Sequence, residues 1–115
     1  MGDNLDALKL FLPQGMGEYF DLVKVEETEY TMVLHLEERN ILPSGLNAED
    51  YETKDFLPPK GVLDFPIRGK EVKLMLSMRR WRHKNSGESI KRDWNIVMDG
   101  GLVTQEFADF LKELD

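Results

Sequence analysis

The stretch that decides the fold runs from Asp64 to Val97 and is DFPIRGKEVKLMLSMRRWRHKNSGESIKRDWNIV. Apolar side chains recur at every second position from Val72 to Met78, with mostly polar ones between them. This alternation is typical of a strand with one buried face. Asn85-Ser86-Gly87 then supplies a turn, because Gly87 can take the positive φ that closes a three-residue hairpin loop. The stretch therefore predicts a β-hairpin.

The loop length predicts the register of this hairpin. Pairing Lys84 with Glu88 produces three apolar pairs, Met78 with Trp94, Leu76 with Ile96 and Leu74 with Met98. All of these side chains then share one face of the hairpin. A slip by one residue would turn one strand's apolar side chains outward, so the pattern and the turn favour the same register.

The opposite face of the predicted hairpin concentrates positive charge. The same register places Trp81 opposite Lys91 and Arg79 opposite Asp93 on that face, and it leaves Arg80 facing Arg92 near the tip. Like charges opposite one another are unfavourable. Two explanations are open. Either the tip is solvated or neutralised by a carboxylate such as Glu88, or the two guanidinium groups hold an anion such as a phosphate.

Charge is distributed unevenly along the chain. The 115 residues carry a formal net charge of −7, yet the segment 68–92 holds nine Lys or Arg against two Glu. The remainder holds six Lys or Arg against twenty Asp or Glu. A basic ribbon on an acidic body can contact phosphates, although the net negative charge weakens long-range attraction to DNA. The ribbon can equally meet an acidic protein surface, including that of a second copy, so a monomer and a homodimer are both open.

Length and composition predict a single cytoplasmic domain over residues 1–115, without a membrane span or a signal peptide. The absence of cysteine excludes disulfides and thiolate zinc sites. Neither His35 nor His83 belongs to a catalytic motif, and the glycine pairs lack the remainder of a phosphate-binding loop. We therefore predict a protein that is not an enzyme and that has no cofactor and no metal site.

The whole pattern predicts an α+β fold in which two antiparallel β-hairpins form a sheet. A short N-terminal helix is expected over residues 5–12 and an amphipathic helix at the C-terminus. Thr104 should cap that last helix, and its apolar stripe should close the core, or alternatively form a dimer contact.

The N-terminal half predicts the other hairpin and a long loop. Segments 19–26 and 30–38 should pair with Val25 opposite Tyr30. Prolines and glycines punctuate segment 39–61, which predicts an irregular loop with one helical turn near residues 47–51.

A basic hairpin that carries an aromatic side chain is compatible with DNA binding. Two-stranded ribbons can enter the major groove, with Arg and Lys on phosphates. Trp81 lies between Arg79, Lys91 and His83 in the predicted ribbon. It can stack on a base or support an arginine, or it can pack against a neighbour on the second face of the sheet.

One motif of this chain resembles a known family. The motif is Asp64-Phe65-Pro66-Ile67-Arg68-Gly69-Lys70-Glu71-Val72, and it is followed by a strand and by Arg79-Arg80-Trp81. The family is the N-terminal region of bacterial insertion-sequence transposases whose head is a zinc-knuckle domain. It shows Asp-x-Pro-x-x-Gly-x-x-Val, then an alternating strand that ends in two arginines and an aromatic. The preceding hairpin and Thr104-Gln105-Glu106-Phe107 extend the similarity to a stand-alone version of that region.

The resemblance implies a role in recognising transposon ends or in assembling a transposase, with strand transfer performed by a separate catalytic subunit or domain. The implied partners are duplex DNA and that transposase catalytic subunit. The implied DNA-facing cations are Arg68, Lys70, Arg79, Arg80, Arg82, Lys84, Lys91 and Arg92. The alternative is a protein-interaction module whose basic hairpin binds an acidic surface without DNA.

One departure from the family concerns zinc. The family places its first cysteine pair after the second strand, where segment 39–61 of this chain has neither Cys nor His. His83 stands where a third cysteine would follow the arginines. We therefore expect no zinc, and we expect the proline-rich loop and its aromatic side chains to hold that end together.

Overall fold

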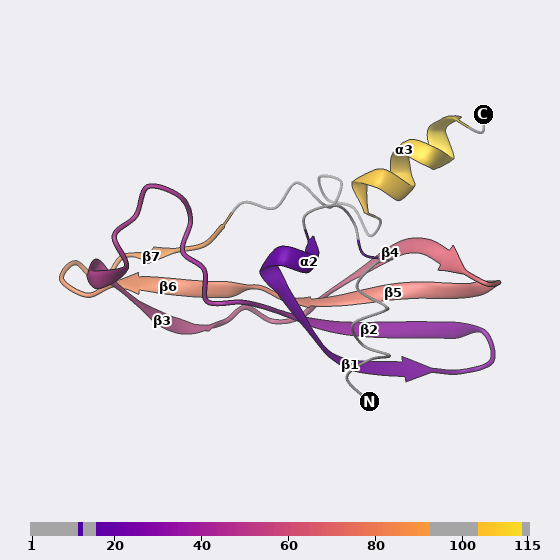
Figure 1. Cartoon of the computed structure of the whole chain (residues 1–115), viewed down its shortest axis with the longest axis horizontal. Helices are drawn as coiled ribbons and strands as arrows, with labels where there is room; N and C mark the ends of the chain where they lie inside the picture. Colours follow the sequence, from indigo (N-terminus) through magenta and orange to yellow (C-terminus); the bar gives the residue numbers. More distant parts are fainter. Residues whose placement is uncertain (1–11, 13–15, 93–103, 114–115) are drawn as a thin grey trace.

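The computed structural model describes residue 12 and segments 16–92 and 104–113, apart from the side chains of Gln105 and Ala108. The fold is α+β and mostly β, as the sequence predicts. The strands of two sheets lie between helix α2 (Met16–Tyr19) and helix α3 (Gln105–Glu113) in the sequence. The molecule is elongated, 50 × 38 × 21 Å, with one sheet towards each end of the long axis (Figure 1). Apart from Leu12, the predicted N-terminal helix lies outside the described residues.

The larger sheet has four strands in the order β1-β2-β5-β4. These are β1 (Phe20–Glu27), β2 (Thr31–Glu38), β5 (Lys70–Ser77) and β4 (Lys60–Ile67). β1 pairs with β2 and β4 pairs with β5 in antiparallel fashion, whereas the inner strands β2 and β5 are parallel. The sheet therefore consists of two hairpins, as predicted, but the second hairpin is β4–β5.

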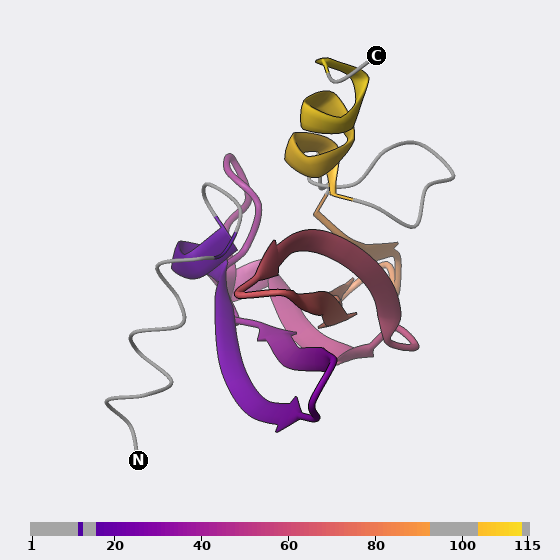
Figure 2. The ribbon, with the colours of Figure 1, turned by 90° about the vertical axis from the view of Figure 1, so that its right-hand side faces the viewer.

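The core lies on one face of this sheet. The parallel register sets Met32 beside Val72, Leu34 beside Leu74 and Leu36 beside Leu76, and all six side chains are at most 8% exposed. Each contributes about 1.5–3 kcal/mol when it is buried. Figure 2 shows the sheet curling, with α2 beside it, and the buried cluster also includes Met16, Phe20, Leu22 and Val62.

The smaller sheet has three strands in the order β3-β6-β7. These are β3 (Tyr51–Phe56), β6 (Arg79–His83) and β7 (Ser89–Ile90). A single residue, Met78, separates β5 from β6, so one extended run of chain passes from the larger sheet into the smaller. The predicted helical turn is the 3₁₀ helix η2 (Ala48–Asp50), which Asn47 caps with a 3.0 Å bond from the Glu49 amide.

The basic hairpin exists, but its predicted register is wrong by one residue. Trp81 pairs with Ile90 instead of Lys91. The His83 amide donates to the Glu88 carbonyl, so the loop has four residues, 84–87, instead of three. Gly87 does take a positive φ, +76°.

The predicted return strand cannot pair with β5. Leu74 and Leu76 already have neighbours in β2 on one side and β4 on the other. The predicted partners Trp94, Ile96 and Met98 lie outside the described residues, as does Asp93, the expected partner of Arg79.

The first hairpin is also confirmed with a different register. Val25 pairs with Leu34 and not with Tyr30, because the turn is centred on residues 29–30, two residues further along the chain than expected. The Thr28 hydroxyl accepts bonds from the Tyr30 and Thr31 amides and thereby shapes that turn. Tyr30 is consequently 71% exposed at the turn.

Segment 39–61 is not an irregular loop throughout, since it contains β3 and the beginning of β4. β3 escapes detection because its sequence, YETKDF, is polar and five of its six residues are exposed. The stripe of α3 does not close the core either. Phe107 and Phe110 contact Phe65, yet Phe110 is 45% and Leu111 is 42% exposed.

The predicted cap of α3 is confirmed, and it involves Asp64, the first residue of the Asp-x-Pro motif. The Thr104 hydroxyl accepts from the Phe107 amide at 3.3 Å and donates to the Asp64 carboxylate at 2.9 Å. The Thr104 amide donates to the Leu63 carbonyl of β4. Burial raises the pKa of Asp64, against the bonds from Phe65 and Thr104 that lower it. Asp64 therefore fixes the beginning of α3 on the sheet.

Candidate nucleic-acid interface

The structure divides the predicted DNA-facing residues between two places. Arg68 and Lys70 belong to the β4–β5 turn, at one end of the long axis (Figure 1). The others lie in or beside the three-stranded sheet, namely Arg79, Arg80, Trp81, Arg82, Lys84, Lys91 and Arg92. A strand advances about 3.3 Å per residue, so the run from Lys70 to Lys84 extends over most of the molecule. The nine residues therefore do not form one surface.

The β4–β5 turn has an unusual backbone. Arg68 has a φ of +50° and Gly69 a φ of +79°. Lys70 forms an ion pair with Glu27 of β1, so its ammonium group is already neutralised. Arg68 is exposed and has no ion-pair partner among the described residues.

Two arginines of β6 are paired with carboxylates of β3. Arg80 donates two bonds to Asp55, at 2.7 and 2.6 Å, and Arg82 donates two bonds to Glu52, at 3.2 and 2.9 Å. The bonds from Arg80 lower the pKa of Asp55. The predicted contact of Arg80 with Arg92 is wrong. A carboxylate does neutralise the ribbon, but it comes from β3 and not from Glu88.

These ion pairs are at the surface. The side chains of Arg80 and Arg82 are 31% and 49% exposed, and those of Asp55 and Glu52 are both 45% exposed. Exposed pairs contribute about 0–1 kcal/mol, because water and salt screen them. A phosphate, which accepts the same forked bonds, can therefore compete with either carboxylate.

Arg79 and Arg92 have structural positions around Glu38, which is 1% exposed. The Arg79 amide donates to the Glu38 carboxylate at 2.9 Å, and the Arg92 Nε lies 3.6 Å from its other oxygen. Arg79 also covers the Phe56 ring and Arg92 covers the Tyr19 ring, each at 4.6 Å. The Arg79 backbone and the Arg92 side chain thus lie against a buried carboxylate, and both guanidinium groups are poorly placed to face DNA.

Trp81 is completely buried, with an exposure of 0%. Its indole N–H donates to the Asn40 side chain at 2.8 Å. The predicted stacking of Trp81 on a base is therefore wrong for this conformation, and the alternative interpretation, packing inside the protein, is confirmed.

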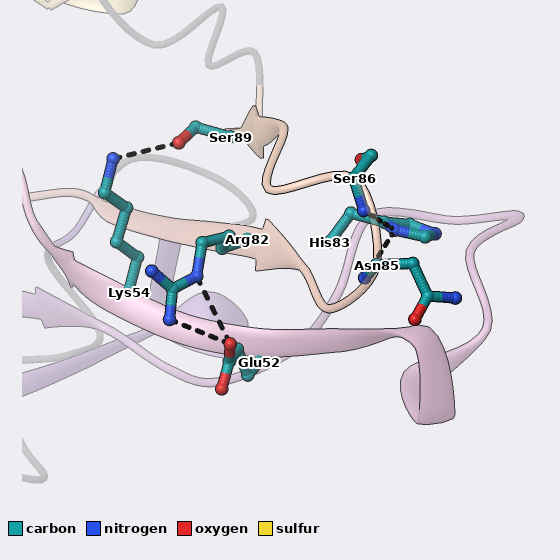
Figure 3. A network of polar contacts seen from close by, with 7 residues as sticks. All are labelled: Glu52, Lys54, Arg82, His83, Asn85, Ser86 and Ser89. Carbon is teal, nitrogen blue, oxygen red and sulfur yellow. Dashed lines mark hydrogen bonds and ion pairs between the residues drawn. The ribbon is translucent and has the colours of Figure 1, made fainter.

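The tip of the β6–β7 hairpin is held by several bonds (Figure 3). His83 Nδ1 accepts from the amides of Asn85 and Ser86 at 3.2 and 3.1 Å. The His83 and Tyr51 rings are perpendicular to each other, with centroids 5.0 Å apart. The Lys84 amide donates to the Asp50 carbonyl of η2. Sequence reasoning missed this role of His83, because it treated the residue only as a possible ligand or catalyst.

Two cations beside this tip remain available. Lys84 and Lys91 are exposed, and neither ammonium group has an ion-pair partner among the described residues. Lys54 of β3, which was not predicted, donates to the Ser89 hydroxyl of β7 at 3.0 Å (Figure 3). Its exposed ammonium group adds a third positive charge to this end of the molecule.

Comparisons of the chain with protein-family models, with curated proteins and with solved structures found no match. Within the described segments, no three His, Asp or Glu side chains are grouped so that they could hold a metal ion. None of the helices in those segments is long and apolar enough to cross a membrane.

Proposed function

We propose that the chain is a non-catalytic DNA-recognition or accessory region of an insertion-sequence transposase, acting in the cytoplasm. In this proposal it contacts duplex DNA with the β6–β7 hairpin. The observation that carries the proposal is a hairpin whose loop is held by hydrogen bonds and which has exposed Lys84 in that loop and exposed Lys91 directly after β7, both without carboxylate partners among the described residues. Strands of a β-sheet can lie in a groove of DNA. The resemblance to transposase N-terminal regions supplies the kind of DNA, a transposon end.

The charge near the tip supports this choice of surface. Segments 48–56 and 79–92 together hold seven Lys or Arg and five Asp or Glu, whereas the remaining residues hold eight and seventeen. The three-stranded sheet is thus the positive end of an acidic protein. The acidic remainder repels DNA, so we expect binding that is weak at physiological salt and strong at low salt.

The test is duplex binding measured over a range of salt concentrations. Each neutralised phosphate contributes about −0.9 to the slope of log K against log[salt], so two to four contacts predict a slope of about −2 to −4. Lys84→Glu should weaken binding and reduce the magnitude of the slope by about 1.

Arg68→Glu is the matched control, since it makes the same charge change in the turn at the other end of the molecule. It should leave the slope unchanged, apart from a small loss of affinity through the net charge. No duplex binding at low salt, or equal losses in both variants, would contradict the proposal.

A second measurement concerns the paired arginines. Glu52→Gln and Asp55→Asn keep the size of each side chain but remove the charge that competes with phosphate for Arg82 and Arg80. If β6 faces the DNA, both variants should bind the duplex more tightly than the unmodified chain. Unchanged affinity would restrict the contact to the lysines of the tip.

One observation favours the alternative, a protein-interaction module. The remaining residues carry seventeen Asp or Glu against eight Lys or Arg, so the basic tip of one molecule can meet the acidic surface of another copy or of the transposase. A mass that falls with added salt in light scattering, together with no mobility shift on DNA, would favour this function over DNA recognition.

A further inference from the structure

The loop of the β6–β7 hairpin, residues 84–87, has a fixed backbone. His83 receives three of its four amide protons: its ring Nδ1 accepts from Asn85 and Ser86, and its carbonyl accepts from Gly87 at 2.9 Å. The fourth amide, that of Lys84, is bound to Asp50. Because every amide of the loop has a partner, the direction in which the Asn85 side chain leaves the backbone is determined before any ligand arrives.

The Asn85 side chain takes no part in this network. Its backbone amide bonds to His83, whereas its side-chain amide makes no hydrogen bond with any residue in the described part of the chain. Figure 3 shows the carboxamide pointing away from the His83 ring, and the residue is exposed. The neighbouring Ser86 hydroxyl, in contrast, accepts from the Glu88 amide at 3.2 Å. Asn85 therefore gives the loop an exposed, uncharged polar side chain beside the charged Lys84.

A carboxamide presents a donor and an acceptor side by side. This pair matches the N7 acceptor and the N6 donor of adenine in the major groove, so an asparagine there forms two bonds to one base. Lys84, the preceding residue, can reach a phosphate as the loop enters the groove. Phosphate contacts set the position of the protein, and the carboxamide adds a base preference.

We infer that Asn85 recognises an adenine in the major groove, an inference that rests on the proposed contact between the hairpin and duplex DNA. In the same inference His83 is a positioning residue, because its ring nitrogen holds the loop that carries Asn85. The site accordingly has two parts, a cationic part that is indifferent to sequence and a single amide that distinguishes one base pair.

The experiment uses the full chain and a pool of short duplexes with a randomised centre, from which bound molecules are recovered at low salt and sequenced. The unmodified chain should enrich adenine at one position. Asn85→Ala should lose that enrichment by about tenfold, within the range for a bidentate base contact. Asn85→Gln should keep it, because glutamine presents the same pair of groups to adenine. Both variants should bind the unselected pool as the unmodified chain does.

The role of His83 is tested by rescue. His83→Ala should remove the adenine preference, because the amides of Asn85 and Ser86 lose their acceptor. His83→Asn should restore it, since an asparagine side-chain oxygen accepts from the backbone two residues further on. A purely structural role would predict equal loss of thermal stability in both variants without a change in base preference.

The outcomes separate the two proposals. Duplex binding without an adenine preference, or a preference that Asn85→Ala retains, overturns the role of Asn85 and leaves the proposed function intact. Failure of the unmodified chain to bind any duplex overturns the proposed function, and the role of Asn85 with it. Loss of the preference in Asn85→Ala, with retention in Asn85→Gln, supports the inference.

Discussion

The two sheets of this molecule are stabilised in different ways. The four-stranded sheet buries a continuous apolar face, and Leu34, Leu74 and Val62 are at most 1% exposed. The three-stranded sheet buries Trp81 but otherwise depends on backbone pairing and on the surface ion pairs between β3 and β6. The positive strand β6 thus belongs to a sheet in which the carboxylates of the neighbouring strand β3 neutralise its arginines. Binding of an anion and stability of that sheet are therefore linked.

The largest expected effect concerns the core of the four-stranded sheet. Leu74→Ala removes a fully buried side chain and should lower the free energy of unfolding by about 2–5 kcal/mol, through lost burial and the cavity that remains. Denaturant titration followed by circular dichroism measures this loss. Glu37→Ala, an exposed position on the neighbouring strand β2, is the control and should change stability by less than about 0.5 kcal/mol. Equal losses would contradict the comparison.

A smaller effect is expected where α3 meets the sheet. Thr104→Val keeps the shape of the side chain but removes the hydroxyl that caps the helix and bonds to Asp64. We expect a loss of about 1 kcal/mol. Thr104→Ser, which retains the hydroxyl, is the matched control. Thermal unfolding distinguishes the two variants, and identical midpoints would show that the cap contributes nothing.

The ion pairs of the three-stranded sheet should contribute less. A double-mutant cycle of Arg82→Ala and Glu52→Ala should give a coupling energy of about 0.2–1 kcal/mol, because both side chains are nearly half exposed. The coupling should decrease as salt is added. A coupling above about 2 kcal/mol would mean that the pair is a structural element, which phosphate could not easily displace.

The smallest effects are opposite dependences of stability on pH in the two sheets. Burial raises the pKa of Asp64 above 3.8, so its contribution favours folding at low pH and is lost as the pH rises through the folded pKa. Arg80 lowers the pKa of Asp55 below 3.8, so its contribution is present above 3.8 and is lost as the pH falls through the folded pKa. The free energy of unfolding should be measured from pH 3 to pH 6, a range set around the ordinary carboxyl pKa values. Asp64→Asn and Asp55→Asn should each change the slope of this free energy against pH, and the two changes should have opposite signs. Slopes of the same sign would contradict these assignments.

The sequence predicted the elements that depend on burial or on a local turn. β1, β2 and β5 alternate apolar and polar residues, Gly87 takes its positive φ, and Thr104 caps α3. In each case the physical cause lies within a few residues of the element that it determines. Local patterns therefore sufficed for these elements.

What the sequence missed depends on partners that are distant in the chain. β3 is a strand because β6, whose paired residues lie 23 to 32 positions further along the chain, supplies its hydrogen bonds and its arginines. The register of the first hairpin depends on a turn that lies two residues further along the chain than expected, and that of the basic hairpin on one additional loop residue, neither of which alternation reveals. The arginine and tryptophan positions alone did not show that β3 neutralises Arg80 or that the interior encloses Trp81.

The single residue between β5 and β6 has a mechanical consequence. Met78 also accepts a hydrogen bond from the Leu57 amide, so the junction is braced by a second segment of the chain. Because only Met78 separates β5 from β6, a force applied to the hairpin tip is transmitted along the backbone to the apolar core. A ligand that binds the hairpin tip therefore also sets the orientation of the four-stranded sheet.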